Sequence, residues 1–234
     1  GPALNGHFRG AILGACTDCR RLTAEYQAGT LTADTYRQAE DNAFRSKGHC
    51  MVMGTASTMN SLLEAMGIAL PGNGDTPAVD SRRIRLAEQT GRAIVDVARR
   101  GVTPSSILTR QAFENAITLL CALGGSTNAV LHLPAIAGRL GIDLPLDLFD
   151  AISRRTPVIT SLKPTGKYQM EDLFYAGGIP AVLRQLLPLL HGDAPTAFGT
   201  TLAETVRHAV IVNPAVIQTL DAPNHPEGGL AILR

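Results

Sequence analysis

The chain has 234 residues, of which 45% are hydrophobic and 18% charged, and its net charge is +1. This composition is typical of a globular protein and argues against intrinsic disorder. The balanced charge, without a dense cluster of lysine and arginine, argues against nucleic-acid binding, which depends on several clustered phosphate contacts. No run of 18 apolar residues occurs, so we expect no membrane-spanning segment.

The cysteine content indicates a reducing compartment. Four cysteines, Cys16, Cys19, Cys50 and Cys121, are too few for a disulfide framework in a chain of this length. The first residues also lack the basic and apolar pattern of a signal peptide. We therefore expect a cytoplasmic protein, in which each cysteine fills the core, binds a metal or acts as a reactive thiol.

Capping residues and apolar spacing predict helices along most of the chain. Thr32 is expected to cap a helix that ends near residue 45, and Asp80 one that ends near residue 100. Thr109 is expected to cap a helix that ends at Gly124. Further helices are expected at 126–141, 147–155 and 180–190.

The region from residue 49 to residue 67 predicts a loop or short strand followed by a helix. Residues 55–58 are Thr, Ala, Ser and Thr, a composition typical of a helix start. The apolar residues that follow recur with the spacing of one helix face, and Gly67 is a natural end. These apolar residues are Met59, Leu62, Leu63 and Met66.

Three short apolar runs, at 157–162, 209–212 and 230–233, are predicted strands. Helices that alternate with such strands favour an α/β fold, which we expect to be a helix-rich layered domain with a small, mainly parallel sheet. Residues 1–190 are interpreted as the helix-rich core. Residues 191–200 contain glycine, proline and threonine, and residues 191–234 are interpreted as a linker and a segment that leads out of this domain.

Cys50 is the candidate metal ligand, and two interpretations of it remain open. It lies five residues before the predicted helix start, where the positive end of a helix lowers a thiol pKa and favours the thiolate that binds iron. Alternatively, Cys50 is a small buried hydrophobic residue beside Met51, Val52 and Met53.

The other cysteines and the histidines are weaker candidates. Cys16 and Cys19 form a C-x-x-C pair, which suits half a zinc site or a redox pair, but no second pair completes it, so we interpret both as incidental. Cys121 lies within a predicted helix and is expected in the core. His49 either lines a pocket beside Cys50 or is a loop histidine. His132 is expected to be a core histidine.

Two short loops offer groups that suit an acidic ligand. Residues 124–128 read Gly-Gly-Ser-Thr-Asn and place backbone N–H groups at a helix start, which suits a carboxylate, although we favour a tight turn with an ordinary N-cap. Residues 163–167 are too short for a phosphate-binding P-loop. A lysine there could meet an acidic substrate, but a surface turn is the preferred interpretation.

Several blocks in order resemble the dihydroxy-acid and sugar-acid dehydratases. Residues 48–67, which contain Gly48, His49 and Cys50, resemble the family segment that carries a cluster cysteine. The sequences of residues 53–59 and of residues 5–10 are more similar to those of the sugar-acid members. The remaining blocks that resemble the family are 70–72, 112–117, 122–133, 163–168 and 176–180.

The resemblance implies a hydro-lyase that converts a 2,3-dihydroxy acid or sugar acid to a 2-keto-3-deoxy acid with an iron–sulfur cluster and Mg²⁺. A [2Fe–2S] cluster is favoured over a [4Fe–4S] cluster. In the family the cluster has three cysteine ligands, of which this chain matches one, Cys50. The other two, the Mg²⁺ ligands and the catalytic serine are expected outside this chain, the serine in a C-terminal barrel-like domain that would follow residue 234.

These expectations define a partial enzyme with no catalytic residue of its own and with unknown substrate-binding residues. The chain begins without methionine, and we expect it to be an internal piece that is inactive alone. The resemblance implies a small-molecule hydroxy-acid substrate and a homo-oligomer, a dimer or tetramer, in the full-length protein. The alternatives are a non-catalytic interaction or scaffold domain derived from the same family, and a C-x-x-C thiol oxidoreductase.

Overall fold

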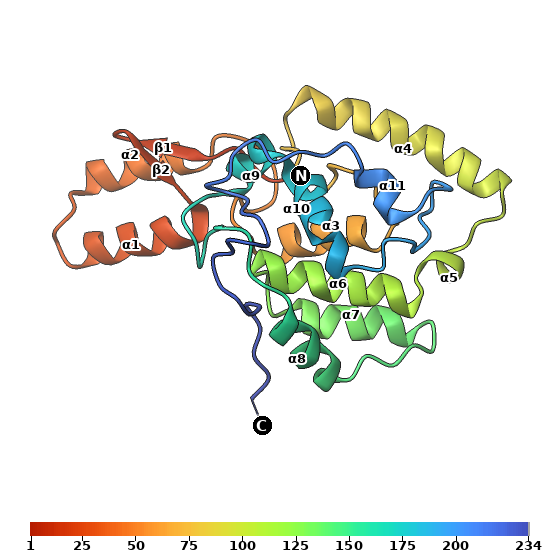
Figure 1. The fold of residues 1–234 in the computed structure, drawn as a ribbon. Coiled ribbons are helices and arrows are strands. Elements are labelled where there is room, and N and C mark those ends of the chain that lie inside the picture. Colours follow the sequence, from red (N-terminus) through yellow and green to blue (C-terminus); the bar gives the residue numbers. More distant parts are fainter. Residues whose placement is uncertain (234) are drawn as a thin grey trace.

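The computed structural model describes residues 1–233, without the side chains of residues 15 and 16, and is dominated by helices (Figure 1). No helix among these residues is both long and apolar enough to cross a membrane. The elements are β1 (Gly6–Phe8), β2 (Ala11–Leu13), α1 (Ala15–Gln27), α2 (Ala33–Ala43), α3 (Thr55–Ala65), α4 (Ser81–Arg99), α5 (Pro104–Ile107), α6 (Arg110–Leu123), α7 (Ala129–Gly138), α8 (Leu146–Arg155), α9 (Met170–Ala176), α10 (Gly178–Leu186), the 3-10 helix η1 (Leu187–Leu189) and α11 (Leu202–Val206).

The helix-rich α/β prediction is confirmed, but the expected parallel arrangement of the sheet is wrong. The sheet in the described residues is a two-stranded antiparallel hairpin in which Gly6 pairs with Leu13 and Phe8 with Ala11. Arg9 and Gly10 form its turn, and both have positive φ, 48° and 81°. Two consecutive residues with positive φ are typical of the tight turns that join antiparallel strands.

The three predicted strands do not form strands. Val158, Thr160 and Leu162 make only isolated bridges, to His225, Ile217 and Tyr168. Their run is buried, as the apolar pattern indicates, but each bridging partner comes from a different irregular segment, so no ladder is built. Residues 209–212 and 230–233 have no strand structure either.

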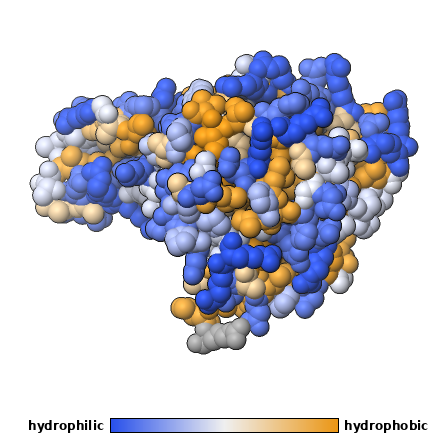
Figure 2. Space-filling model, viewed as in Figure 1, coloured by the Kyte–Doolittle hydropathy of each residue, from blue (hydrophilic) through white to orange (hydrophobic). Residues whose placement is uncertain are grey.

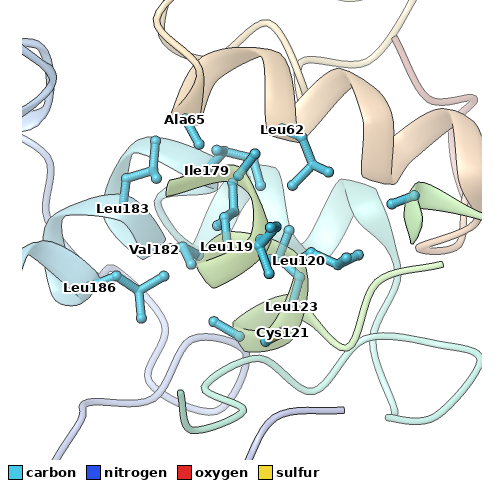
Figure 3. Packing of buried hydrophobic residues seen from close by; sticks show 14 of the residues in the cluster. Leu62, Ala65, Leu119, Leu120, Cys121, Leu123, Ile179, Val182, Leu183 and Leu186 are labelled. Carbon is cyan, nitrogen blue, oxygen red and sulfur yellow. The ribbon is translucent and has the colours of Figure 1, made fainter. Parts of the chain in front are cut away.

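Helix α6 is the centre of the main core. Every residue from Ala112 to Leu123 except Glu114 is buried, and a helix that is apolar on nearly all sides must be surrounded by other elements. In Figure 3, leucines of α6 converge with Leu62 and Ala65 of α3 and with the apolar face of α10 in one cluster. The labelled α10 residues in that face are Ile179, Val182, Leu183 and Leu186.

Two parts of the structure extend from this helical body, the lobe of α1, α2 and the hairpin, and helix α4. Helices α1 and α2 pack with the hairpin as a lobe at one side of the molecule, around the small core of Leu13, Leu22, Ala39 and Ala43 (Figure 1). Helix α4 runs along the opposite upper edge and buries only Leu86. Hydrophobic surface gathers between them in the middle of the face shown in Figure 2, where α9 and the chain after α11 pass.

The chain after residue 190 packs on the helical body. Leu202, Val206, Val216 and Ile217 belong to the main core, and Ala194 and Thr196 are also buried. The boundary expected between residues 190 and 191 remains a prediction, because packing alone does not define a domain limit.

Two buried carboxyl groups join α3, the following loop and α10. Glu64 of α3 accepts hydrogen bonds from the N–H groups of Gly72 and Gly74, at 2.9 and 2.6 Å. Asp75 accepts one from the Ile179 N–H at the start of α10. Burial raises the pKa of Glu64, and the neighbouring Asp75 raises it further. Burial also raises the pKa of Asp75 to about 7.

We expect these carboxyls to make the fold less stable as the pH rises. Because the pKa of Asp75 is about 7 in the fold against an ordinary 3.8, its protonated form favours folding fully below pH 3.8, and this contribution is lost as the pH rises through 7. Denaturant unfolding should give a lower free energy at pH 8 than at pH 5, by at most about 3 kcal/mol. Asp75→Asn should reduce this difference, and an undiminished difference in Asp75→Asn would contradict the assignment.

Candidate functional site

Residues 48–54, here called the Cys50 loop, are held in place by the first residues of the chain. The Ala3 N–H donates to the His49 carbonyl at 2.9 Å, and the His49 N–H donates to the Gly1 carbonyl at 3.1 Å. Gly48 has φ of 141°, and a Cβ atom there would lie 2.7 Å from the Ala3 Cα. Only glycine therefore allows the two segments to approach this closely.

Cys50 is half-buried and packs against Ala3, Met51 and Val52. Met51 and Val52, the next two residues, are 0% and 4% exposed, whereas Cys50 is partly exposed. Its carbonyl accepts a hydrogen bond from the Ser57 hydroxyl of α3 at 3.3 Å. Cys50 as a residue is therefore neither fully buried nor fully exposed, which leaves the metal-ligand interpretation open.

His49 ties the Cys50 loop to α3. Its Nε2 lies 3.2 Å from the Asn60 side-chain amide, and its Nδ1 lies 3.2 Å from the Cys50 carbonyl. Burial lowers the pKa of His49, the hydrogen bond to the Cys50 carbonyl opposes this, and the positive charge of Arg83 lowers it further. A neutral ring that donates from Nδ1 to the carbonyl and accepts at Nε2 satisfies both contacts. His49 thus positions the loop.

A pocket of about 600 Å³ opens beside the Cys50 loop, and it begins at Met53 and Gly54. The pocket is formed by segments that are distant in sequence. These are the start of α3, the loop before α7, the chain around residue 160 and residues 224–229. Its lining is rich in hydroxyl groups, those of Thr55, Ser126, Thr127, Thr160, Ser161 and Thr165.

The start of α3 differs from the expected capping. The N-cap residue is Gly54, which provides no side-chain cap, so the hydroxyl residues of 55–58 lie within the helix. The Thr55 hydroxyl lies 3.1 Å from that of Ser126 and accepts from the Asn128 amide at 2.8 Å. These contacts hold the first turns of α3 and α7 together at the pocket.

The loop of residues 124–128 is a tight turn, the preferred interpretation of its sequence, because the N–H groups of Gly124, Gly125, Ser126 and Asn128 all donate within the chain. Gly124 has φ of 58° and ends α6, as expected. The Ser126 hydroxyl accepts from the Asn128 N–H at 3.3 Å, as in a tight capping turn, and Ser126 also lines the pocket. The Ser126 N–H donates to the Thr58 hydroxyl at 2.9 Å, which fixes the turn on α3.

Lys163 is engaged rather than free on a surface turn. Its carbonyl accepts from the Met53 N–H at 2.9 Å, and its ammonium lies 3.0 Å from the Asp18 carboxylate of α1. Burial alone would raise the pKa of Asp18, but the Gly14 N–H and the Lys163 ammonium together lower it. This ion pair connects the α1 lobe to the Cys50 loop. Sequence reasoning missed it because the two residues are 145 positions apart.

Burial and pKa distinguish the roles of the other candidate cysteines and histidines. Cys121 is 1% exposed and burial raises its pKa to about 11, so it is a core residue as predicted. Burial raises the pKa of Cys19, and the charges of Asp18, Glu40 and Cys50 raise it further, which argues against a reactive thiolate. The Cys16 side chain lies outside the described residues. His132 is exposed, so its prediction as a core histidine is wrong.

The described residues provide a partial metal site at most. No three His, Cys, Asp or Glu side chains among them converge in a way that could hold a metal ion. The accessible part of Cys50 suits one thiolate bond to a cluster, but the remaining ligands would have to come from residues that this structure does not describe. The fit is therefore that of a single ligand.

A known protein family matches the part of the chain that contains the Cys50 loop and most of the pocket residues. Residues 1–205 match the family described as dihydroxy-acid/6-phosphogluconate dehydratase N-terminal. The chain belongs to this dehydratase family. The resemblance noted in the blocks of its sequence is thereby confirmed.

Individual dehydratases are similar over all or most of the chain. An L-arabinonate dehydratase of Rhizobium leguminosarum is 49% identical over 100% of the chain and 41% of its own length. Dihydroxy-acid dehydratases of Caldanaerobacter subterraneus and Ignicoccus hospitalis are 48% and 52% identical over 100% and 85% of the chain. The chain covers 42% and 36% of those two proteins, so it spans less than half the length of these relatives.

The close approach at Gly48 yields a stability prediction. Gly48→Ala should lower the free energy of unfolding by about 2 kcal/mol or more, because it adds a methyl group against the Ala3 backbone at positive φ. The matched control is Gly54→Ala in the same loop, where φ is −88° and nothing lies within 4 Å of an added Cβ. Thermal or denaturant unfolding should separate the two, and equal losses would contradict the clamp.

Proposed function

We propose that this chain is part of a hydro-lyase that removes water from a 2,3-dihydroxy acid or sugar acid and gives a 2-keto-3-deoxy acid. The observation that carries the proposal is the dehydratase family match over residues 1–205, which includes Cys50 and the hydroxyl residues of the neighbouring pocket. The relatives include dihydroxy-acid dehydratases and an L-arabinonate dehydratase, so both substrate classes belong to the proposal.

The pocket has the chemistry that a polyhydroxy acid needs. Hydroxyl side chains donate and accept hydrogen bonds, so they can contact several substrate hydroxyls at once. Helix α3 begins at the pocket, and the positive end of a helix favours a carboxylate. In this proposal the threonine and serine hydroxyls orient the substrate and leave its reacting carbons towards the Cys50 loop.

Cys50 is proposed to hold one iron of an iron–sulfur cluster, a [2Fe–2S] cluster in preference to a [4Fe–4S] cluster. When bound, such iron supplies Lewis acidity to the departing hydroxyl group. The role of His49 is to fix the Cys50 carbonyl through its neutral ring, so that the loop presents the sulfur in one orientation. The Lys163–Asp18 pair holds the other side of the same loop.

Proton removal from the substrate is assigned to a residue outside this chain. Among the residues described as lining the pocket, His225 is the one titratable side chain, and it is exposed. A base that removes a weakly acidic C–H proton has to be positioned at the substrate. The Mg²⁺ ligands, the two further cysteines and the homo-oligomeric assembly are likewise part of the proposal for the full-length protein, as is its cytoplasmic location.

The cluster assignment predicts the effect of Cys50→Ser in the full-length protein. The anaerobically purified variant should lose most of its visible iron–sulfur absorption and at least half of its bound iron, because a serine oxygen is a poorer ligand than a thiolate. Cys19→Ser is the matched control and should keep both. An unchanged spectrum in Cys50→Ser would refute the ligand assignment but leave the family membership intact.

A second prediction concerns the chain by itself. These 234 residues, supplied with iron, sulfide and Mg²⁺ under anaerobic conditions, should show no dehydration of arabinonate or 2,3-dihydroxyisovalerate above the protein-free rate. The described residues provide one thiol ligand and no buried base at the pocket, so two parts of the chemistry are missing. The assay measures 2-keto acid formation, and sustained turnover would show that this chain carries the complete machinery.

A further inference from the structure

Asn73 and Gly74, in the loop after α3, form one of the two Asn-Gly pairs of the chain. In such a pair the glycine nitrogen can attack the side-chain carbonyl carbon of the asparagine, because this closes a small, unstrained succinimide ring. Glycine has no Cβ atom to obstruct the approach. The attack is slow unless a base takes the proton of the nitrogen and a donor stabilises the carbonyl oxygen as it becomes negative. The groups that contact these two atoms therefore decide whether the pair reacts.

A carboxyl group contacts the nucleophilic nitrogen. The Gly74 N–H donates to Oε1 of Glu64 at 2.6 Å, and Oε2 of Glu64 accepts from the Gly72 N–H at 2.9 Å. These two bonds fix the Glu64 side chain with one oxygen on the proton that has to leave. Burial raises the pKa of Glu64, and Asp75 raises it further, so its carboxylate is a stronger base than that of an exposed glutamate.

A guanidinium group contacts the carbonyl that would be attacked. Nη1 of Arg83 donates to the Asn73 side-chain oxygen at 3.0 Å, and Nη2 donates to the Asn73 main-chain carbonyl, also at 3.0 Å. Nη2 also donates to the Thr76 carbonyl, which fixes the guanidinium in this position. A positive charge on the side-chain oxygen draws electrons from Cγ and stabilises the oxyanion that the attack produces. The base and the cation thus contact the two reacting groups of one residue pair.

Water can reach Asn73, which is half-buried. It lines a groove of about 280 Å³ between α4 and the chain that follows α3. Ammonia can leave and water can enter through this groove, and both are required if the amide is to be converted to an acid.

The second Asn-Gly pair, Asn5 and Gly6, has different surroundings. Asn5 is 3% exposed, and its side-chain oxygen has no hydrogen-bond partner among the described residues. Gly6 belongs to β1 and pairs with Leu13 of the hairpin. The same chemical unit therefore occurs in the chain a second time, buried and without an arginine on its side-chain oxygen.

We propose that Asn73 and Gly74 are a self-modification site, at which Glu64 acts as the base and Arg83 stabilises the oxyanion. The Gly74 nitrogen gives its proton to Glu64 and forms a bond to Cγ of Asn73, while the carbonyl electron pair moves to the oxygen beside Arg83. The intermediate collapses when the Cγ–Nδ2 bond breaks, and ammonia leaves with the proton that Glu64 returns. Water then opens the succinimide and leaves aspartate or isoaspartate at position 73. The reaction consumes water, releases ammonia and is independent of the dehydratase chemistry proposed above.

Incubation of the folded chain in mildly alkaline buffer tests this site. Peptide mapping by mass spectrometry measures the replacement of the amide by an acid at each asparagine. Asn73 should react about tenfold faster than in a synthetic peptide of residues 70–76, because the peptide lacks Glu64 and Arg83. Asn5 is the internal reference and should remain unmodified over the same period. A turn that is only held rigid slows ring closure, so a rate at Asn73 equal to or below that of the peptide, or matched by Asn5, would overturn the proposal.

Two substitutions separate catalysis from rigidity of the loop. Glu64→Gln keeps an oxygen that accepts from the backbone but cannot take the proton, and it should slow the reaction at Asn73 about tenfold. Arg83→Lys should also slow it, because a lysine cannot donate to both Asn73 oxygens in the same way. Glu88→Gln, which removes an exposed carboxylate of α4, is the matched control and should leave the rate unchanged.

The direction of the change decides between the two roles of these contacts. If Glu64 and Arg83 only hold the turn, their substitution frees the turn and accelerates the reaction at Asn73. An increased or unchanged rate in Glu64→Gln, with thermal unfolding that shows the variant to be folded, would therefore overturn the proposal. The comparison of the unmodified chain with the peptide uses no variant, and it decides the matter if Glu64→Gln does not fold.

Discussion

The burial of α6 on nearly all sides is the constraint on which the rest of the structure depends. Because most of its surface is apolar, elements from both halves of the chain have to cover it, and α3, α7, α8 and α10 each contribute a face. The helix ends at Gly124, whose left-handed conformation turns the chain directly into the loop before α7. This turn is where α3 also begins, and the pocket lies there as a consequence.

Predictions from the sequence succeeded where the determining interactions are local. The caps Thr32, Asp80 and Thr109 each accept the expected backbone hydrogen bond, because capping involves residues two or three positions apart. The hairpin was missed because its strands have three residues each, too few to show an alternating pattern. The apolar run at 157–162 correctly indicated burial, but whether a buried run joins a sheet depends on partners that are distant in sequence.

The candidate site likewise contains one residue that could be identified from the sequence and several contacts that could not. Cys50 was identified from a resemblance carried by neighbouring residues, and nothing in its spacing alone distinguished it from a core cysteine. The pocket could not be predicted, because Thr55, Ser126 and Thr160 meet only through the packing of α3 and α7 around α6. The contact of His49 with Asn60 and the pair of Lys163 with Asp18 were missed for the same reason. Each unites residues whose proximity is a result of the tertiary fold.

The participation of residues 224–229 in the pocket has a consequence for the order in which the molecule is completed. These residues come almost at the end of the described chain, yet Asn224 and His225 bond to Val158 and form one wall of a cavity whose other walls arise within the first 166 residues. During synthesis the helices can assemble long before this wall exists. A ligand that fills the cavity would contact the helical body and residues 224–229 together, so its binding and the attachment of this segment are thermodynamically linked.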